Sequence, residues 1–291
     1  MEERHRPDLA LVYLPHLDYN LQRKGPADTS VAVDYREIDQ VVGELMAFYG
    51  SRGVRSVVLS EYGITQVNRS IALNRVFRAR GWIQIKEELG TELMDCGASK
   101  VFAIADHQVA HVYVNDPALL NSVRSVLEGV AGVARVLGTE EQRLEGLDHA
   151  RSGDLVVFSD EDAWFTYYYW EDETKAPDFA RCVDIHRKYG YDPVELFVDP
   201  KIFLPQLKVA GKLARKRLGF RILMNVISLD PSLVKGSHGT CPADSAEWPV
   251  LIGAGRLGSD DAGSIPALDV FERLLEVCGE QKKRKAEMGK S

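Results

Sequence analysis

The chain has 291 residues, of which 45% are hydrophobic and 27% are charged. This is enough apolar material for one large domain or two smaller ones. The formal charge of −7 and the pI near 5.6 disfavour non-specific binding to nucleic acid. There is no apolar run of about 18 residues that would predict a membrane span, and the charged start of the chain does not resemble a signal peptide. A cytoplasmic location is therefore expected.

Two short basic clusters stand out against this acidic composition. They are residues 212–217 (KLARKR) and 282–285 (KKRK), and each is interpreted as a solvated face or tail. The second cluster lies in residues 281–291, which are expected to be a disordered basic tail. The four cysteines are scattered and include no CxxC pair. Neither a zinc knuckle nor a redox dithiol is therefore indicated.

The first third of the chain alternates apolar strands with helices. Residues 8–14 and 54–59 are short apolar runs, which predict strands buried on both faces. Helices are predicted at residues 34–49 and 70–80, and a further strand at 81–87. This alternation is typical of an α/β fold with a mostly parallel sheet flanked by helices. Such sheets bind their ligands at the carboxyl ends of the strands.

The middle of the chain has a different pattern. Residues 101–114 predict two short strands, 117–129 a helix with Pro117 near its start, and 133–137 another strand. Residues 154–170 predict two more strands and hold an aromatic cluster. The aromatic side chains are interpreted as core packing, with a platform that lines a pocket as the alternative. This pattern predicts a smaller α+β cap or insert.

The last third of the chain returns to the pattern of the first. A basic amphipathic helix is predicted at residues 206–217, a buried strand at 220–227 and a final helix at 266–278. The chain is therefore expected to hold a partial α/β core and a cap region. The core is assigned to residues 1–95 and 200–280, and the cap to residues 96–199.

Three polar segments follow predicted strands or lie close behind them. Asp18 follows the first strand, residues 60–63 (SEYG) follow the second, and residues 236–239 (GSHG) come after the last buried strand. Polar groups at strand ends are rigidly held and close to one another, which favours a binding site. A helix cap or a turn is the alternative role for each residue taken alone. His238 has small glycine neighbours on both sides, which give its imidazole open access.

Together the three segments resemble the motifs of the type I phosphodiesterase/nucleotide pyrophosphatase family, within the alkaline phosphatase superfamily. The family's D-x-x-G-H-x-x-G-P motif corresponds to residues 18–26 (DYNLQRKGP), its S-D-H-G-M motif to 60–64 (SEYGI) and its G-x-H-G motif to 236–239 (GSHG). The order and the rough separations of the motifs agree, and the resemblance spans about residues 8–260, with a loose match in the middle. The resemblance implies an alkaline-phosphatase-like fold and a phosphoric-ester hydrolase that acts on a small phosphate ester.

The resemblance also implies a site with two divalent metal ions, usually zinc. Paired metals polarise a phosphoryl group, and a Thr or Ser side chain attacks it. By position in the motifs, Asp18, Gln22 and His238 would hold one metal. Glu61 and Tyr62 would hold the other.

The residues at these metal positions depart from the family pattern. Gln22 and Tyr62 stand where the family has histidines, and Glu61 stands where it has an aspartate. An amide is a weaker zinc ligand than an imidazole, and a phenolate prefers a harder metal. Manganese or iron is therefore an alternative to zinc. The family's nucleophile comes from a segment ahead of the first motif, so the catalytic residue is expected outside this chain, as in a fragment of a longer enzyme.

Other polar residues outside the motifs are assigned more loosely. His186, Arg187 and Lys188 are adjacent groups that can bind phosphate, and they are predicted to contact the substrate. His107, in the middle block, is interpreted as structural. The alternative function is a non-catalytic relative that kept the fold to bind a ligand or partner after its metal site decayed, which the substituted ligands favour.

Overall fold

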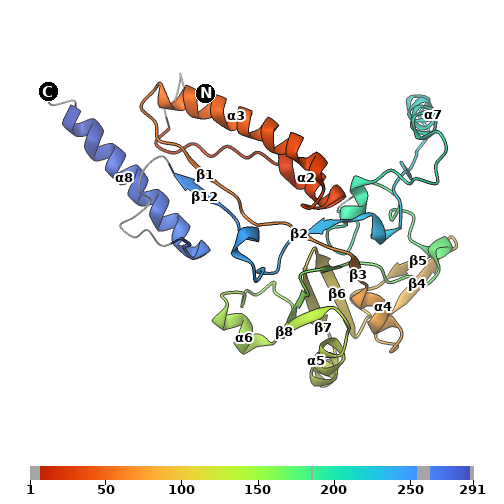
Figure 1. Cartoon of the computed structure of the whole chain (residues 1–291). Helices are drawn as coiled ribbons and strands as arrows, with labels where there is room; N and C mark the ends of the chain where they lie inside the picture. Colours follow the sequence, from red (N-terminus) through yellow and green to blue (C-terminus); the bar gives the residue numbers. More distant parts are fainter. Residues whose placement is uncertain (1–6, 185, 254–262, 289–291) are drawn as a thin grey trace. The chain divides into compact units, whose positions relative to one another are not determined.

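The computed structural model describes residues 7–184, 186–253 and 263–288 (Figure 1). The chain divides into two compact units, each made of segments that are distant in the sequence. Unit 1 comprises Met1–Leu17, Ala32–Glu61 and Pro249–Ser291, and unit 2 comprises Asp18–Val31 and Tyr62–Trp248. The core and cap boundaries expected from the sequence stay a prediction.

Unit 1 combines helices with a two-stranded sheet. α3 (Ala32–Gly50) confirms the first predicted helix. β1 (Val57–Leu59) confirms the core of the second predicted strand, and it pairs antiparallel with β12 (Leu251–Gly253). α8 (Val270–Met288) begins where the last helix is predicted and continues into the stretch expected to be a disordered tail. The Lys, Arg, Glu, Ala and Met residues of that stretch are good helix formers, which accounts for the longer helix.

The prediction of a doubly buried strand at residues 8–14 is wrong. This segment is in neither a helix nor a strand, and its apolar side chains are exposed, Leu11 by 83% and Tyr13 by 72%. Within the described part of the chain, no strand pairs with it, so its backbone groups lack a ladder. The strand predicted at residues 220–227 is also absent, apart from an isolated bridge between Val198 and Ile227.

The segment that carries the first motif is helical. α2 (His16–Lys24) has Asp18 in its first turn, where the positive end of the helix dipole favours a carboxylate. Gln22 follows four residues later, so both side chains project from the same side of the helix. The residues of α2 from Asp18 onward belong to unit 2.

The main sheet of unit 2 is antiparallel, with the strand order β6-β7-β9-β8. Its strands confirm those predicted in the middle block of the chain. β6 and β7 are joined by a two-residue turn, because Asp106 pairs with Val109. The strands are β6 (Val101–Asp106), β7 (Val109–Val114), β8 (Val133–Leu137) and β9 (Leu155–Ser159).

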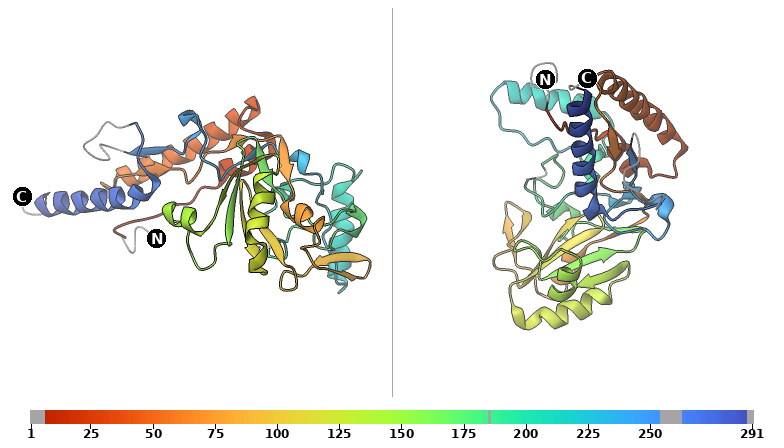
Figure 2. Two further views of the ribbon diagram at one scale, coloured as in Figure 1. Left: turned by 90° about the horizontal axis from the view of Figure 1, so that it is seen from below. Right: turned by 90° about the vertical axis from the view of Figure 1, so that its left-hand side faces the viewer.

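Short helices accompany this sheet. α4 (Leu73–Arg78) packs beside β6, and α5 (Leu120–Glu128) packs beside β8 (Figure 2). The buried side chain of Asn74 fixes α4 in place, because its amide accepts from the backbone N–H of Ala103 at 2.8 Å and donates to the carbonyl of the same residue at 2.9 Å. α6 (Thr139–Leu144) follows β8. In the described part of the chain, no helix is both long and apolar enough to cross a bilayer.

Three smaller strand pairs and one more helix complete unit 2. Among the described strands, only β3 and β10 pair in parallel. The fold is thus mixed α/β, and the mostly parallel sheet expected from the sequence is not seen among the described strands. Two of the antiparallel pairs are hairpins with short turns, and the others join strands that are distant in the sequence or separated by a helix. The elements are β2 (Thr65–Gln66) with β11 (Gly236–Ser237), β3 (Arg69–Ile71) with β10 (Ala163–Phe165), β4 (Ile85–Glu88) with β5 (Thr91–Met94), and α7 (Pro205–Arg217).

The aromatic cluster after β10 lies in the core of unit 2. Trp164, Tyr167, Tyr168, Tyr169 and Trp170 are all 2% exposed or less. Burial of aromatic rings removes a large apolar area from water, and edge-to-face contacts between them add to the packing energy. The core interpretation of this cluster is therefore confirmed.

Candidate functional site

Residues from the three motifs meet in unit 2. The Tyr62 hydroxyl donates a hydrogen bond to a carboxylate oxygen of Asp18 at 3.1 Å. The ring of Tyr62 stacks on the imidazole of His238, with centroids 3.7 Å apart and planes 10° from parallel. Asp18, Tyr62 and His238 are far apart in the sequence, so only the tertiary fold can bring them together.

Glycines in the third motif allow its close approach to α2. A Cβ on Gly236 would lie 2.2 Å from the carbonyl oxygen of Leu21, closer than any side chain can come. The backbone N–H of Lys235 donates to the carbonyl of Gln22 at 2.9 Å. Gly239 has φ +124°, a conformation that favours glycine. The two glycines of the G-x-H-G pattern are thus required by backbone geometry, and the start of this motif lies against α2.

His107 belongs to this site, although the sequence analysis interprets it as structural. Its imidazole lies 3.9 Å from that of His238 and 4.8 Å from the ring of Tyr191, measured between centroids. Its Nδ1 is 3.5 Å from the hydroxyl oxygen of Ser237. A two-residue polar turn between apolar strands marks a hairpin in the sequence. Nothing in the sequence shows which loop that hairpin faces.

Burial makes both imidazoles neutral. It lowers the pKa of His238 to about 4, a shift that the nearby Asp18 carboxylate partly opposes. It lowers the pKa of His107 to about 3, and the neighbouring His238 contributes in the same direction. Both rings are therefore unprotonated near neutral pH, which is the form of histidine that coordinates metals.

Gln22 places an unsatisfied polar atom in the same region of unit 2. Its side chain is buried, with 1% of the residue exposed, and its Oε1 accepts no hydrogen bond from any described residue. A buried acceptor without a partner costs about 1–3 kcal/mol. A cation or a water molecule at this oxygen would remove that cost.

The donor set of these residues fits a hard divalent cation better than it fits zinc. Asp18 and Gln22 offer oxygen atoms, His238 offers one nitrogen, and the phenol of Tyr62 becomes a ligand only when it loses its proton. Oxygen-rich sets suit manganese, magnesium or iron, whereas zinc prefers imidazole and thiolate. Asp18, His107 and His238 do not bring three ligand atoms within 4.8 Å of one another. Glu61 is the last residue of its segment in unit 1.

The described residues contain one such tight group of ligand atoms, in unit 1. It consists of His16, Asp34 and Glu37, with 3.3 Å between His16 Nε2 and Glu37 Oε2. The two carboxylates lie in the first turns of α3, where the helix dipole stabilises them without a metal. His16 and Glu37 are also exposed, and an exposed pair of this kind contributes little stability.

The three residues predicted to contact substrate lie in different environments. The Lys188 side chain is fully buried, with its Nζ 3.3 Å from Asp192 and 2.5 Å from Glu195. A phosphate would have to displace these carboxylates to reach it. Arg187 is exposed and pairs with Asp178 at 2.9 Å, and His186 is exposed.

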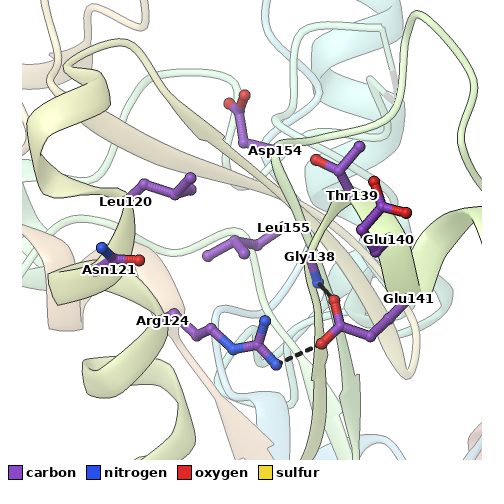
Figure 3. Close-up of a pocket in the computed structure, with 9 residues that line it drawn as sticks. All are labelled: Leu120, Asn121, Arg124, Gly138, Thr139, Glu140, Glu141, Asp154 and Leu155. Carbon is purple, nitrogen blue, oxygen red and sulfur yellow. Dashed lines mark hydrogen bonds and ion pairs between the residues drawn. The ribbon is translucent and has the colours of Figure 1, made fainter.

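A shallow pocket of about 220 Å³ lies elsewhere on unit 2, between α5 and the start of α6 (Figure 3). Its cation, Arg124, donates to Glu141 at 2.8 Å and to Glu128 at 2.9 Å. Figure 3 shows the guanidinium turned toward the Glu141 carboxylate. The positive charge is already neutralised, so the pocket offers no site for a phosphate.

Comparison with known proteins identifies the family. The model of the type I phosphodiesterase / nucleotide pyrophosphatase family matches residues 1–192, about two thirds of the chain. The chain therefore belongs to this family, as the motifs indicate. No curated protein matches the chain.

Solved structures also show similarity to this chain. Phosphonoacetate hydrolase from Sinorhizobium meliloti 1021, in complex with phosphonoformate, is 19% identical with a TM-score of 0.39, over 52% of this chain and 37% of the other. Murine ectonucleotide pyrophosphatase / phosphodiesterase 5 is 18% identical with a TM-score of 0.38, over 53% and 38%. The human protein of that name is 16% identical with a TM-score of 0.38. The chain thus spans less than two fifths of each of the first two structures.

Proposed function

We propose that the chain is a phosphoric-ester hydrolase domain that acts on a nucleotide or another small phosphate or phosphonate ester with the help of divalent metal ions. The observation that carries the proposal is the meeting of Asp18, Tyr62 and His238, joined by a 3.1 Å hydrogen bond and a 3.7 Å ring stack. Membership of the phosphodiesterase family supports it.

The roles proposed for the residues follow the family motifs. Asp18, Gln22 and His238 hold one metal, and Glu61 and Tyr62 contribute to a second. Bound metals would supply positive charge to the phosphoryl oxygens. The residues of the chain orient the donors, and the partly buried, neutral imidazole of His238 presents a lone pair without first releasing a proton.

The nucleophile is proposed to lie outside residues 1–291, in a longer native polypeptide. The exposed apolar side chains of residues 9–14 in unit 1 support this, with Leu11 83% and Tyr13 72% exposed, because contiguous apolar surface of this kind is normally covered. His186 and Arg187, both exposed, are kept as proposed contacts to the phosphate. Lys188 could join them only if its carboxylate partners move.

Metal analysis of the purified chain tests the proposal. We expect bound divalent metal after purification, and a higher melting temperature with manganese, iron or zinc, since a ligand that binds only the folded state stabilises it. Asp18→Asn and His238→Ala should each abolish both effects. Glu37→Gln is the matched control, because it removes a carboxylate from the surface group on α3 and should leave both effects intact.

Two results would contradict the metal site. One is a chain without metal and without thermal stabilisation. The other is metal that is lost in Glu37→Gln and retained in Asp18→Asn, which would place the bound ion at the surface group of unit 1.

A second candidate function is a non-catalytic relative that binds a ligand or a partner. The observation that favours it is that several of the proposed ligands contact one another directly. Tyr62 bonds to Asp18, and His238 lies against both Tyr62 and His107. Wild-type chain that binds a small phosphate ester without metal would support this candidate over the first.

A further inference from the structure

The turn between β6 and β7 has an unusual backbone. His107 has φ +56°, and among the described residues only Leu89 is a second non-glycine residue with positive φ. Two-residue hairpin turns need such angles, and Asn, Asp or Gly normally supply them. Leu89 is fully exposed, whereas His107 is only 5% exposed. A buried histidine with a strained backbone conformation indicates that its side chain makes specific contacts.

The ring of His107 packs against the third motif. It lies 3.9 Å from the His238 ring, on which Tyr62 stacks at 3.7 Å. Its Nδ1 is 3.5 Å from the hydroxyl oxygen of Ser237. The ring of His238 therefore has two aromatic neighbours, supplied by segments far from it in the sequence.

The other turn residue, Gln108, forms hydrogen bonds to the loop that carries His238. Its N–H donates to the carbonyl of His238 at 2.9 Å. Its Oε1 accepts from the hydroxyl of Thr240 at 3.1 Å and from the N–H of Thr240 at 3.3 Å. The side-chain amide donates to the Thr65 hydroxyl at 3.1 Å. Gln108 is completely buried, so its bond to Thr65 is shielded from water, while the bonds to Thr240 are partly shielded.

The turn itself is anchored in the core of unit 2. The carbonyl of His107 accepts from the N–H of Phe165 at 2.7 Å, and the carbonyl of Gln108 accepts from the N–H of Ser159 at 3.0 Å. Phe165 is fully buried. Core strands thus hold the turn in place, and the turn holds the loop that carries His238.

We propose that His107 is a positioning residue, whose imidazole, together with the bonds of Gln108, holds the His238 ring in one orientation at the site. His238 is taken here as a metal ligand, so the metal part of the inference rests on the proposed function. The claim that His107 orients the His238 ring does not rest on the proposed function, because it concerns the metal-free chain. Residues behind a metal ligand set the ligand's direction, and their loss weakens metal binding roughly 10–100-fold.

Two substitutions at position 107 distinguish the effect of the ring from the effect of backbone strain. His107→Phe keeps an aromatic ring on His238 and loses the nitrogen atoms, whereas His107→Ala loses the ring. Both carry a Cβ, so the strain from the positive φ is alike in the two variants. Val112→Ala is the control for stability, because it opens a cavity at a fully buried position of β7 without removing a ring contact of His238.

Two measurements are made on each variant. One is the NMR signal of the His238 ring in metal-free, histidine-labelled chain at a single pH, assigned with His238→Gln. The other is the affinity for manganese by calorimetry. We expect His107→Ala to shift the His238 signal and to weaken manganese binding roughly 10–100-fold. His107→Phe should stay close to wild type in affinity, and Val112→Ala should change only the melting temperature.

The inference is overturned if His107→Ala lowers the melting temperature as Val112→Ala does and leaves the His238 signal in place. It is also overturned if Phe and Ala at position 107 give the same His238 signal. A wild-type chain that binds no manganese contradicts the metal role of the site, while the NMR comparison still decides whether His107 positions His238.

Discussion

Acid is expected to destabilise the chain through His107 and His238, whose rings are in contact. Burial holds the pKa of His107 at about 3 and that of His238 at about 4, below the ordinary value of 6.5. As the pH falls below 6.5, the two histidines become protonated in the unfolded chain but stay neutral in the folded chain. Stability is therefore present above the unfolded pKa and is lost as the pH falls toward the folded pKa.

The size of the effect follows from these pKa values. Between about pH 7.5 and about pH 5, each histidine lowers the free energy of unfolding by about 2 kcal/mol, and the two together by about 4 kcal/mol. Asp192 acts in the opposite sense, because burial raises its pKa from 3.8 to about 6. Its contribution to stability grows as the pH falls and offsets about 1 kcal/mol of the loss over the same range. The net loss expected from the three groups is about 3 kcal/mol.

Urea unfolding at the two pH values, with a chelator present, measures this loss. In His107→Phe the loss should shrink by about 2 kcal/mol, because one buried titrating group is gone. Val112→Ala should lower stability by the same amount at both pH values, since the replaced side chain does not titrate. The reasoning is refuted if His107→Phe shows the full wild-type loss, or if the wild type becomes more stable toward pH 5.

Three further predictions concern single contacts. Lys188→Met should destabilise the fold by about 3–5 kcal/mol in urea unfolding, because it leaves buried carboxylates without their cation; a change below about 1 kcal/mol would contradict this reasoning. Gly236→Ala should lower the free energy of unfolding by about 1–3 kcal/mol in the same assay, since its Cβ would meet a backbone carbonyl of α2 at 2.2 Å. Wild-type stability in this variant would mean that the motif can move away from α2. Gln22→His combined with Tyr62→His should tighten zinc binding at least about tenfold in calorimetry, because imidazole is the better zinc ligand; unchanged affinity would argue against these two positions as ligands.

Local patterns were enough to predict several elements. The apolar alternation of residues 101–114 is set by its own side chains, and the sheet strands form there. The helix at α3 is likewise predicted from its periodicity. Residues 8–14 show the limit of this approach. Their apolar run is equally typical of a strand, but a strand also needs a partner, and none of the described strands pairs with it.

The sequence also determined which residue types make up the site. Asp18, Tyr62 and His238 are marked by motif order alone, and the departures of residues 22, 61 and 62 from the family motifs are visible without any structure. The backbone role of Gly236 is consistent with its motif, but its cause, the carbonyl of Leu21 at 2.2 Å from a Cβ, is a contact across more than two hundred residues.

Only the tertiary structure decided how these residues act on one another. His107 reaches His238 because the β6–β7 turn and the third motif happen to pack together, a contact that no local pattern encodes. The low pKa of each imidazole has the same origin, since it depends on how much water the surrounding chain excludes. The sequence by itself determined the family and the residue types of the candidate site. Packing between distant segments decided the stack that holds His238 and the charge that it carries.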